Sequence, residues 1–331
     1  MKRTAFFNHD ANSIMNVYAD GRREKVAAIS DLLPEIVTPE NFVEHSNALA
    51  SVEAIFSTWG MMKLTEEQLD AMPALRAVFY GAGSVKAFAD PLLDRGITVV
   101  GAWGANAVPV AEHTVAQIVL ANKGYFHNVR KCATPETRPE AKGGIGNFGE
   151  TVALLGAGQI GKTVTRMLQS YCLEVIIWDP FLEQAVAAEI GAEKVDDIND
   201  AFRRGRVVSN HLANVPETEG LITAEQFELM RPDAAFINTA RGATVVEADL
   251  VEVFSRRLDL TALLDVTDPE PPTADSDLYG LANIHITSHI SGALGSEIVR
   301  MADFMIDEFL AWEQGNPLRY EITAEMLPRL A

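Results

Sequence analysis

The chain has 331 residues, of which 48% are hydrophobic and 22% are charged, a balance that is typical of a folded globular protein and sufficient for about two domains. With 46 acidic and 27 basic residues the formal net charge is −19, which argues against nucleic acid or an anionic membrane surface as a partner. Only two cysteines are present, Cys132 and Cys172, which excludes a disulfide framework and favours a reducing compartment.

The N-terminal segment starts with basic residues but lacks an apolar run long enough for a signal peptide. No stretch approaches about 18 uninterrupted apolar residues, the length that a membrane-spanning helix needs. We therefore expect a cytoplasmic protein that does not enter a membrane.

Short apolar runs, partly β-branched, alternate with helical stretches along most of the chain. The expected strands, each bounded by glycine, asparagine, aspartate or proline, are Ala54–Ser57, Ala77–Tyr80, Ile97–Val100, Val152–Leu155, Val175–Trp178, Val207–Ser209, Ala235–Asn238, Ala262–Leu264 and Ile284–Thr287. The expected helices are Val110–Val129, Ile160–Gln169, Ala224–Met230, Val246–Ser255 and Ser296–Glu313. This alternation predicts parallel sheets covered by helices on both faces, a doubly wound α/β fold.

One segment, residues 132–150, breaks the alternation. It contains Pro135, Pro139 and four glycines and has no apolar period, so it is expected to be a long surface connection. Taken alone, it is also a candidate domain boundary.

A glycine-rich turn in the middle of the chain has the spacing of a dinucleotide site. Gly156, Gly158 and Gly161 fit the pattern Gly-x-Gly-x-x-Gly, with Gln159 and Ile160 between them. A buried-type strand leads into the turn and a helix follows it. In that context the glycines allow a tight turn and a close approach to a pyrophosphate, which the helix N-terminus then binds.

Asp179 follows the next strand, 18 residues after Gly161. A carboxylate at this place accepts hydrogen bonds from the adenosine ribose and repels a 2′-phosphate. The sequence therefore predicts NAD as the cofactor.

Three polar side chains follow the later strands. Arg241 comes after Ala235–Asn238, Glu270 lies in the loop after Ala262–Leu264, and His289 comes after Ile284–Thr287. Residues beyond the carboxyl ends of strands in an open sheet face the ligand crevice. Each one alone is also explained as a surface arginine, a loop carboxylate or a capping histidine.

Together with the glycine-rich turn, these segments resemble the D-isomer-specific 2-hydroxyacid dehydrogenases. That family has the turn in mid-chain and then Asn-Thr-Ala-Arg-Gly, Asp-Val-x-x-x-Glu-Pro and Pro-His-Ile, in this order. Here Arg241 precedes Glu270 by 29 residues, and Glu270 precedes His289 by 19. The resemblance covers most of the chain.

The resemblance implies a Rossmann-type cofactor domain over residues 108–292. It also implies a smaller, flavodoxin-like substrate domain formed by residues 1–107 and 293–331. The glycine-rich segment then becomes a connection within the cofactor domain. A homodimer through the helix and arm near residues 108–150 is implied as well.

The resemblance also implies roles for individual residues. Arg241 binds the substrate carboxylate, His289 is the general acid and base, and Glu270 hydrogen-bonds the imidazole and stabilises its protonated form. The substrate carboxylate is expected to be shared with backbone N–H groups of Gly81, Ala82 and Gly83. The cofactor is expected to contact Gly156, Gly158, Gln159, Ile160, Gly161, Asp179, His211, Thr239, Ala240, Arg241, Asp265, His289 and Gly292. Asp265 resembles the family's aspartate that contacts the nicotinamide carboxamide.

These features predict an oxidoreductase that reduces a small 2-oxo acid to a D-2-hydroxy acid, or the reverse, with NAD. The substrate loop, Gly83-Ser84-Val85-Lys86, departs from the family's usual Gly-Val-Asp-Asn, and Ser288 replaces the usual proline before the histidine. The alternative is a dinucleotide-sensing binding protein of the same fold, like the carboxyl-terminal binding protein corepressors. Glu270 disfavours a formate dehydrogenase, and the mid-chain turn disfavours the L-lactate and malate type. No histidine, cysteine or carboxylate cluster has metal-ligand spacing, so no metal is expected.

Overall fold

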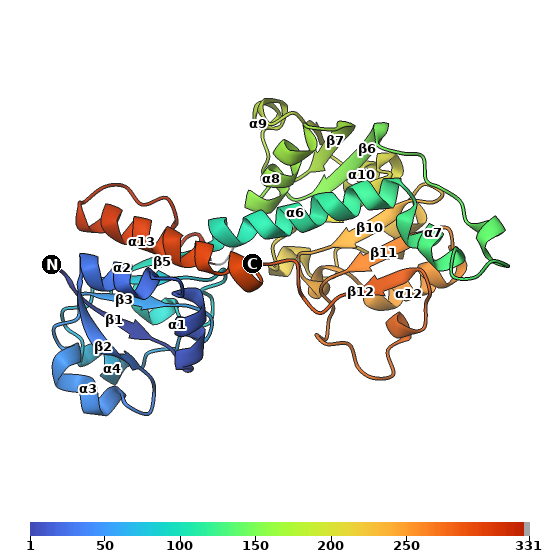
Figure 1. The fold of residues 1–331 in the computed structure, drawn as a ribbon. Helices are drawn as coiled ribbons and strands as arrows, with labels where there is room; N and C mark the ends of the chain where they lie inside the picture. The colour runs from blue at the N-terminus through green and yellow to red at the C-terminus, as the bar shows by residue number, and fades with distance from the viewer. Residues whose placement is uncertain (328–331) are drawn as a thin grey trace. The chain divides into compact units, whose positions relative to one another are not determined.

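The structure, a computed structural model, describes residues 1–327, and the chain divides into two compact units (Figure 1). Among the described residues, unit 1 comprises Met1–Asn106 and the segment from Ala293 to Leu327, and unit 2 comprises Ala107–Gly292. Both limits of unit 2 lie within one residue of those expected from the sequence. In the described part of the chain, every helix is too short or too polar to cross a bilayer.

Unit 1 contains a sheet with the flavodoxin strand order, β2-β1-β3-β4-β5, extended by β13. Its strands are β1 (Arg3–Phe7), β2 (Asp31–Val37), β3 (Ala54–Ser57), β4 (Ala77–Tyr80), β5 (Thr98–Gly101) and β13 (Glu321–Ile322). All neighbours pair in parallel except β13, which pairs antiparallel with β5.

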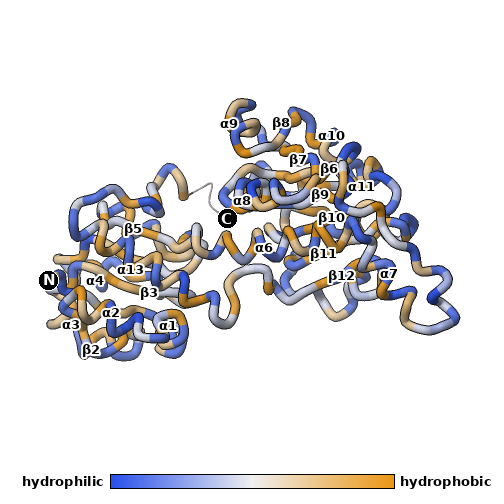
Figure 2. Tube along the Cα trace, turned by 45° about the horizontal axis from the view of Figure 1, so that its top comes forward, coloured by the Kyte–Doolittle hydropathy of each residue, from blue (hydrophilic) through white to orange (hydrophobic). Residues whose placement is uncertain are grey.

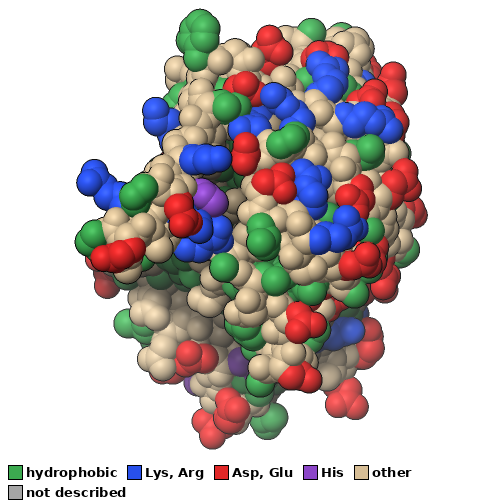
Figure 3. Space-filling view, turned by 90° about the vertical axis from the view of Figure 1, so that its right-hand side faces the viewer, with side chains coloured by type: hydrophobic (Ala, Val, Ile, Leu, Met, Phe, Trp, Pro, Cys, Tyr) green, Lys and Arg blue, Asp and Glu red, His purple; other side chains and the backbone are tan. Residues whose placement is uncertain are grey.

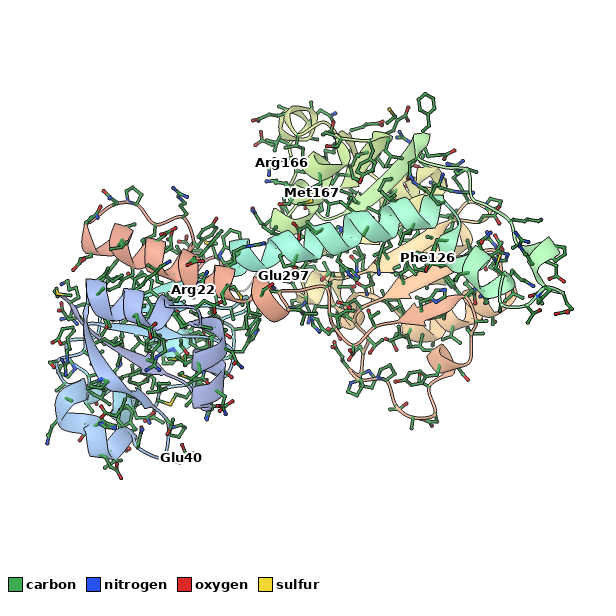
Figure 4. All side chains as sticks on the ribbon, in the orientation of Figure 1. Arg22, Glu40, Phe126, Arg166, Met167 and Glu297 are labelled. Carbon is green, nitrogen blue, oxygen red and sulfur yellow. The ribbon has the colours of Figure 1, made fainter. Side chains whose placement is uncertain are left out.

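Helices cover both faces of this sheet. They are α1 (Ala11–Val17), α2 (Arg22–Ile29), α3 (Phe42–Leu49), α4 (Glu66–Asp70), α5 (Asp90–Leu93) and α13 (Val299–Glu313). One apolar core lies under α1, α2 and α13, and a second lies under α3, α4 and α5. The returning helix α13 is fastened to α2 by Arg22, whose guanidinium donates to both carboxylate oxygens of Asp303 at 3.0 and 2.7 Å (Figure 4).

Unit 2 contains a parallel sheet with the Rossmann order, extended by one strand: β12-β11-β10-β9-β6-β7-β8. Its strands are β6 (Phe148–Leu155), β7 (Cys172–Trp178), β8 (Glu193–Val195), β9 (Val207–Asn210), β10 (Ala235–Asn238), β11 (Thr261–Leu264) and β12 (Ile284–Ile286). The strand order reverses between β6 and β9, so the connections that follow these two neighbouring strands lead to opposite sides of the sheet.

Helices again lie on both faces of this sheet. They are α6 (Trp103–Asn122), α7 (Tyr125–Lys131), α8 (Gln159–Leu168), α9 (Gln184–Glu189), α10 (Ile198–Arg204), α11 (Ala224–Glu228) and α12 (Glu247–Arg256). Apolar residues of α6, α8 and α9 pack on one face and those of α10, α11 and α12 on the other. The hydrophobic strands stand out against the polar connections in Figure 2. The doubly wound α/β prediction is confirmed.

Several boundaries differ from the sequence prediction. The helix expected from Val110 starts earlier, at Trp103, so that Pro109 lies inside it, and it ends at Asn122. Gly124, with a φ of 69°, separates it from α7 because that backbone conformation ends a helix. Four strands, β1, β2, β8 and β13, were not predicted.

Candidate active site

The sequence-predicted site residues of unit 2 all follow the carboxyl ends of its parallel strands. Because those ends lie along one edge of the sheet, the topology gathers residues that are far apart in sequence. The glycine-rich turn follows β6, and Asp179 follows β7. His211, Arg241, Asp265 and His289 come after β9, β10, β11 and β12 respectively.

The glycine-rich turn has the steric features that a bound pyrophosphate needs. Gly156 has a φ of 97°, and a Cβ there would lie 2.8 Å from the carbonyl oxygen of His211. A Cβ on Gly161 would collide with the carbonyl of Gly156, whereas one on Gly158 would meet no atom within 4 Å. The open space lies at Gly158, directly before α8, where helix N–H groups are available to phosphate oxygens. These residues therefore fit a dinucleotide.

The carboxylate of Asp179 faces this turn. Its Oδ2 accepts the backbone N–H of Ala157 at 2.7 Å, and its Oδ1 accepts the N–H of Phe181 at 2.8 Å. Each carboxylate oxygen can accept a second hydrogen bond, so the group retains capacity for ribose hydroxyls.

His211 lies beneath the turn as a neutral imidazole. It is buried, and burial lowers its pKa to about 4. The Nε2 atom is 3.0 Å from the hydroxyl of Ser209, and the buried Nδ1 has no partner in the described residues. Its side chain thus offers one unused polar atom, Nδ1, and its backbone carbonyl lies against Gly156.

A network of amides and a threonine fixes the turn that carries Arg241. Asn238 accepts the N–H of Ala240 at 3.1 Å and donates to the Arg241 carbonyl at 3.1 Å. Asn210 donates to Asn238 at 3.1 Å and to Thr244 at 2.8 Å. Thr239 and Ala240 are buried within this network, so Arg241 is held at a defined place.

The Arg241 guanidinium is largely withdrawn from water. Burial lowers its pKa, and the negative charge of Glu270 acts in the opposite direction. Arginine nevertheless stays charged in proteins. One Nη1 bond, at 2.6 Å, goes to the Ala240 carbonyl, which leaves most of the donor fork available to a carboxylate.

Glu270 and His289 form a hydrogen-bonded pair. The Nδ1 atom of His289 lies 2.7 Å from Oε1 of Glu270, and the two side chains are 44% and 39% exposed. Glu270 also lines a cavity of about 590 Å³ together with Asp265, Thr267 and Thr287. The pair is thus accessible from solvent.

Two contacts hold the Glu270 loop against the Arg241 loop. A Cβ on Gly242 would collide with the backbone of Thr267, so the two chains touch at that glycine. Glu247 accepts the N–H of Asp268 at 2.7 Å, and burial raises its pKa. The two loops therefore keep a fixed spacing.

Asp265 is hydrogen-bonded to residues on both sides of His289. This buried carboxylate accepts the hydroxyl of Thr287 at 2.6 Å and the N–H groups of Ile290 and Ser291 at 2.8 and 2.9 Å. Burial alone would raise its pKa, but these hydrogen bonds outweigh it and the pKa lies below its usual range. His289 itself has a φ of 58°, an uncommon conformation for a residue with a side chain. Sequence analysis did not single out Thr287; its place two residues before the histidine was the available signal.

The predicted substrate loop lies in unit 1. The N–H groups of Gly81 and Ala82 already donate to Ser57 and Tyr80, each at 2.8 Å, and are therefore not free for a carboxylate. Gly83 makes no such backbone bond within the described residues. Of the three predicted donors, Gly83 is the one that stays available.

The remaining predicted contacts lie in the same part of unit 2. Gln159 is exposed and Ile160 half-buried at the start of α8, and Gly292 is the last residue of the unit. Both cysteines are free and exposed, and no group of three metal-binding side chains is found among residues 1–327.

Comparison with known proteins places this architecture in a family. Residues 116–291 match the model of the D-isomer specific 2-hydroxyacid dehydrogenase, NAD binding domain. This match covers more than half of the chain. The chain belongs to the D-isomer-specific 2-hydroxyacid dehydrogenase family. Its unit 2 is the family's NAD-binding domain, and its cofactor is NAD.

Two curated relatives show the range within the family. D-3-phosphoglycerate dehydrogenase of Methanocaldococcus jannaschii is 30% identical over 247 residues, which is 74% of this chain and 47% of that protein. (S)-sulfolactate dehydrogenase of Chromohalobacter salexigens is 31% identical over 246 residues, 74% of this chain and 80% of that protein. The chain thus spans about half the length of the phosphoglycerate relatives that it matches.

Solved structures share the fold. D-mandelate dehydrogenase of Rhodotorula graminis has a TM-score of 0.80 at 20% identity, covering 97% of this chain and 98% of that one. A phosphoglycerate oxidoreductase from Rhizobium etli has a TM-score of 0.79 at 23% identity, covering 98% of each chain.

Proposed function

We propose that this protein reduces a small 2-oxo acid to the D-2-hydroxy acid, and catalyses the reverse reaction, with NAD(H). The observation that carries the proposal is the 2.7 Å contact between His289 and Glu270 at the sheet edge that also presents Arg241 and the dinucleotide turn. A proton carrier, a carboxylate anchor and a cofactor site are the three parts that this reaction requires.

Arg241 is proposed to anchor the substrate. Its planar fork of donors matches the two oxygens of a carboxylate, and its partial burial strengthens the attraction because water competes less. The fixed turn around Asn238 holds Arg241, and with it the bound carboxylate, in one place, so that the adjacent 2-oxo group takes a defined position.

His289 is proposed to supply the proton. Its Nδ1 is engaged by the Glu270 carboxylate, so Nε2 is the nitrogen that exchanges a proton with the substrate oxygen. Bound NADH supplies the hydride. Proton delivery from His289 neutralises the oxygen as that carbonyl is reduced, and in the reverse direction the neutral imidazole accepts the hydroxyl proton.

The substrate is proposed to be a small 2-oxo acid without further assignment. Two of the relatives are named for 3-phosphoglycerate and sulfolactate, compounds that carry a second anionic group besides the carboxylate. Mandelate, for which a third similar protein is named, has no second anionic group. The loop Gly83–Lys86 of unit 1 differs from the family's usual sequence, which makes this loop the proposed determinant of the choice.

The test is NADH oxidation with a panel of 2-oxo acids. The panel contains glyoxylate, pyruvate, hydroxypyruvate, 2-oxoglutarate and 2-ketogluconate, together with the oxo acids of 3-phosphoglycerate and sulfolactate. Turnover that is lost in His289→Ala while NADH still binds supports the proposal. Tight NADH binding without turnover of any panel member contradicts it and favours the dinucleotide-sensing alternative.

We also propose that the protein is a homodimer through the region 108–150. Several large apolar side chains of this region are exposed, including Leu120, Tyr125, Val129 and Ile145. Light scattering on a sizing column distinguishes the 36.0 kDa monomer from a dimer of twice that mass. A single monomeric species would contradict this proposal.

A further inference from the structure

A second cavity lies in unit 2, at the amino ends of the strands. It has a volume of about 160 Å³ and lies beside α7, residues 142–145, and the first residues of β10 and β11. Arg241 and Asp265 follow the opposite ends of those two strands. The proposed catalytic residues therefore take no part in this cavity.

Titratable side chains of several elements line this cavity. They are His127, Lys142, Arg206, Asp233 and Asp259. Figure 3 shows the face that carries α7, where lysine and arginine side chains gather near a histidine. In a chain with a net charge of −19 such a gathering needs an explanation.

Most basic residues at this edge are already neutralised. Ion pairs join Arg203 to Asp200, Arg204 to Glu193, Arg231 to Glu150, Arg256 to Glu228 and Arg257 to Asp259. Several of these cations also end helices, where a positive charge is favourable. Arg206 and Lys142 differ, because among residues 1–327 no carboxylate oxygen lies within 4 Å of either side chain's nitrogens.

Arg206 is the more informative of the two because it is only 8% exposed. Burial lowers its pKa, and the charge of Asp233 acts in the opposite direction. One Nη1 bond goes to the carbonyl of Pro232. A buried guanidinium without a carboxylate partner is costly, and a bound anion would remove that cost.

Of the neighbouring groups, His127 adds a donor and one of the two carboxylates is already paired. Arg130 can only donate, so its 3.3 Å contact with Nδ1 of His127 places the proton of the neutral imidazole on Nε2. Asp259 is held by the Arg257 fork at 3.1 and 2.8 Å. Asp233 is the one lining carboxylate without an ion pair in the described part of the chain. Two unneutralised cations thus face one unneutralised carboxylate.

Phe126 closes the apolar side of the cavity. It comes from α7, and its ring centroid lies 5.4 Å from that of His285 on β12 (Figure 4). The wall limits the room for a ligand to a few heavy atoms.

We propose that this cavity binds a small oxyanion, a phosphate or carboxylate group, between the Arg206 guanidinium and the Lys142 ammonium. The site is separate from the dinucleotide turn and from Arg241, and it does not depend on the proposed enzymatic activity. Because Lys142 and Ile145 belong to the region proposed as the dimer interface, the anion would bind at or beside that interface.

Binding of inorganic phosphate and of acetate to the full-length protein tests the proposal. Titration calorimetry at constant ionic strength is carried out with NADH at saturation and in an Arg241→Ala background, so that neither the glycine-rich turn nor the proposed carboxylate anchor binds the added anion. Acetate probes the carboxylate class and phosphate the phosphate class. We expect one saturable site for at least one of the two anions.

Variants locate that site. Lys142→Gln, at an exposed position, should weaken binding about three- to tenfold, and Arg206→Lys, which loses the fork, by about tenfold or more. Asp233→Asn should tighten binding because it removes the opposing charge. Lys123→Gln, an exposed lysine outside the lining, is the matched control and should leave binding unchanged.

Two results would overturn the proposal. One is the absence of saturable binding of both anions to the wild-type protein. The other is a dissociation constant that Lys142→Gln leaves at the wild-type value, a result that misfolding of the Arg206 variant cannot explain.

Discussion

The Oδ1 atom of Asp265 accepts the backbone N–H of Ile290 at 2.8 Å, so the residue directly after His289 is tied to a buried carboxylate. The bonds from Thr287 and Ser291 complete a clamp on both sides of the histidine. This clamp explains how His289 keeps a positive φ, a conformation that otherwise costs energy.

Asp265→Asn should therefore lower kcat about tenfold or more, because an amide has one acceptor oxygen for three donors and the histidine turn loosens. Unfolding free energy should fall by about 1–3 kcal/mol. Steady-state kinetics and urea unfolding measure the two effects. Thr287→Val, which removes one of the three bonds, is the graded control, and a fully active Asp265→Asn would contradict the clamp.

His289→Ala should lose about 10²–10⁴-fold in turnover while still binding NADH, since general acid catalysis contributes about that much. Glu270→Gln keeps the size but removes the charge next to the imidazolium. Reduction should then persist only at lower pH, with activity near neutrality reduced. Rate profiles against pH for the wild type and Glu270→Gln check this, and an unshifted profile would show that Glu270 does not assist the histidine.

Arg241→Lys keeps the positive charge but loses the two-pronged geometry. The substrate KM should rise, and kcat/KM should fall by about tenfold to a hundredfold, with NADH affinity nearly unchanged. Kinetics with the panel substrate of highest kcat/KM measure the effect on substrate use, and an NADH titration measures the effect on cofactor affinity. Normal turnover of the lysine variant would mean that another group anchors the carboxylate.

Asp179 should make the protein prefer NADH over NADPH by about tenfold or more, because a 2′-phosphate would lie against its carboxylate. Competitive titration of the two nucleotides measures the ratio. In Asp179→Ala the preference should shrink, although the loss of the Ala157 hydrogen bond weakens both nucleotides. An unchanged ratio of NADH to NADPH affinity in the variant would show that Asp179 does not determine the choice of cofactor.

His211 should make the fold sensitive to acid. Its pKa is about 4 in the folded protein and about 6.5 when unfolded, so between these values the unfolded chain binds the additional proton. Its contribution is fully present above pH 6.5 and is lost as the pH falls toward 4, by up to about 3 kcal/mol. Urea unfolding of wild type and His211→Gln across this range should show a shallower pH slope for the variant. His9→Gln, at an exposed position, is the control, and equal slopes for wild type and His211→Gln would exclude the effect.

The sequence was most informative where strands are buried on both faces. β3, β4 and β10 have the predicted bounds because their apolar runs stop at polar or glycine residues. Of the four missed strands, β2, β8 and β13 lie at sheet edges, where strands are short or carry charge and proline. The fourth, β1, lies inside its sheet and was missed although it is buried. β2 contains Pro34 and β8 consists of Glu193–Val195, which is why neither has a strand-like pattern.

For the candidate site, too, the sequence predicted some features and missed others. That Arg241, Glu270 and His289 meet at one edge follows from parallel topology, so their order along the chain was sufficient to predict it. Hydrogen bonds of Asp265 and of the Gly81 turn depend on side-chain and backbone geometry, which no spacing encodes.

Gly242 has a consequence for anyone who would alter this protein. No side chain fits between Gly242 and the Thr267 backbone, and Glu247 accepts a hydrogen bond from the N–H of Asp268 nearby. The loops that carry Arg241 and Glu270 are therefore packed together as one unit. Replacing only one of these loops with that of a relative would disrupt the contacts between them. Segments 239–247 and 265–271 must be exchanged together, as one cassette.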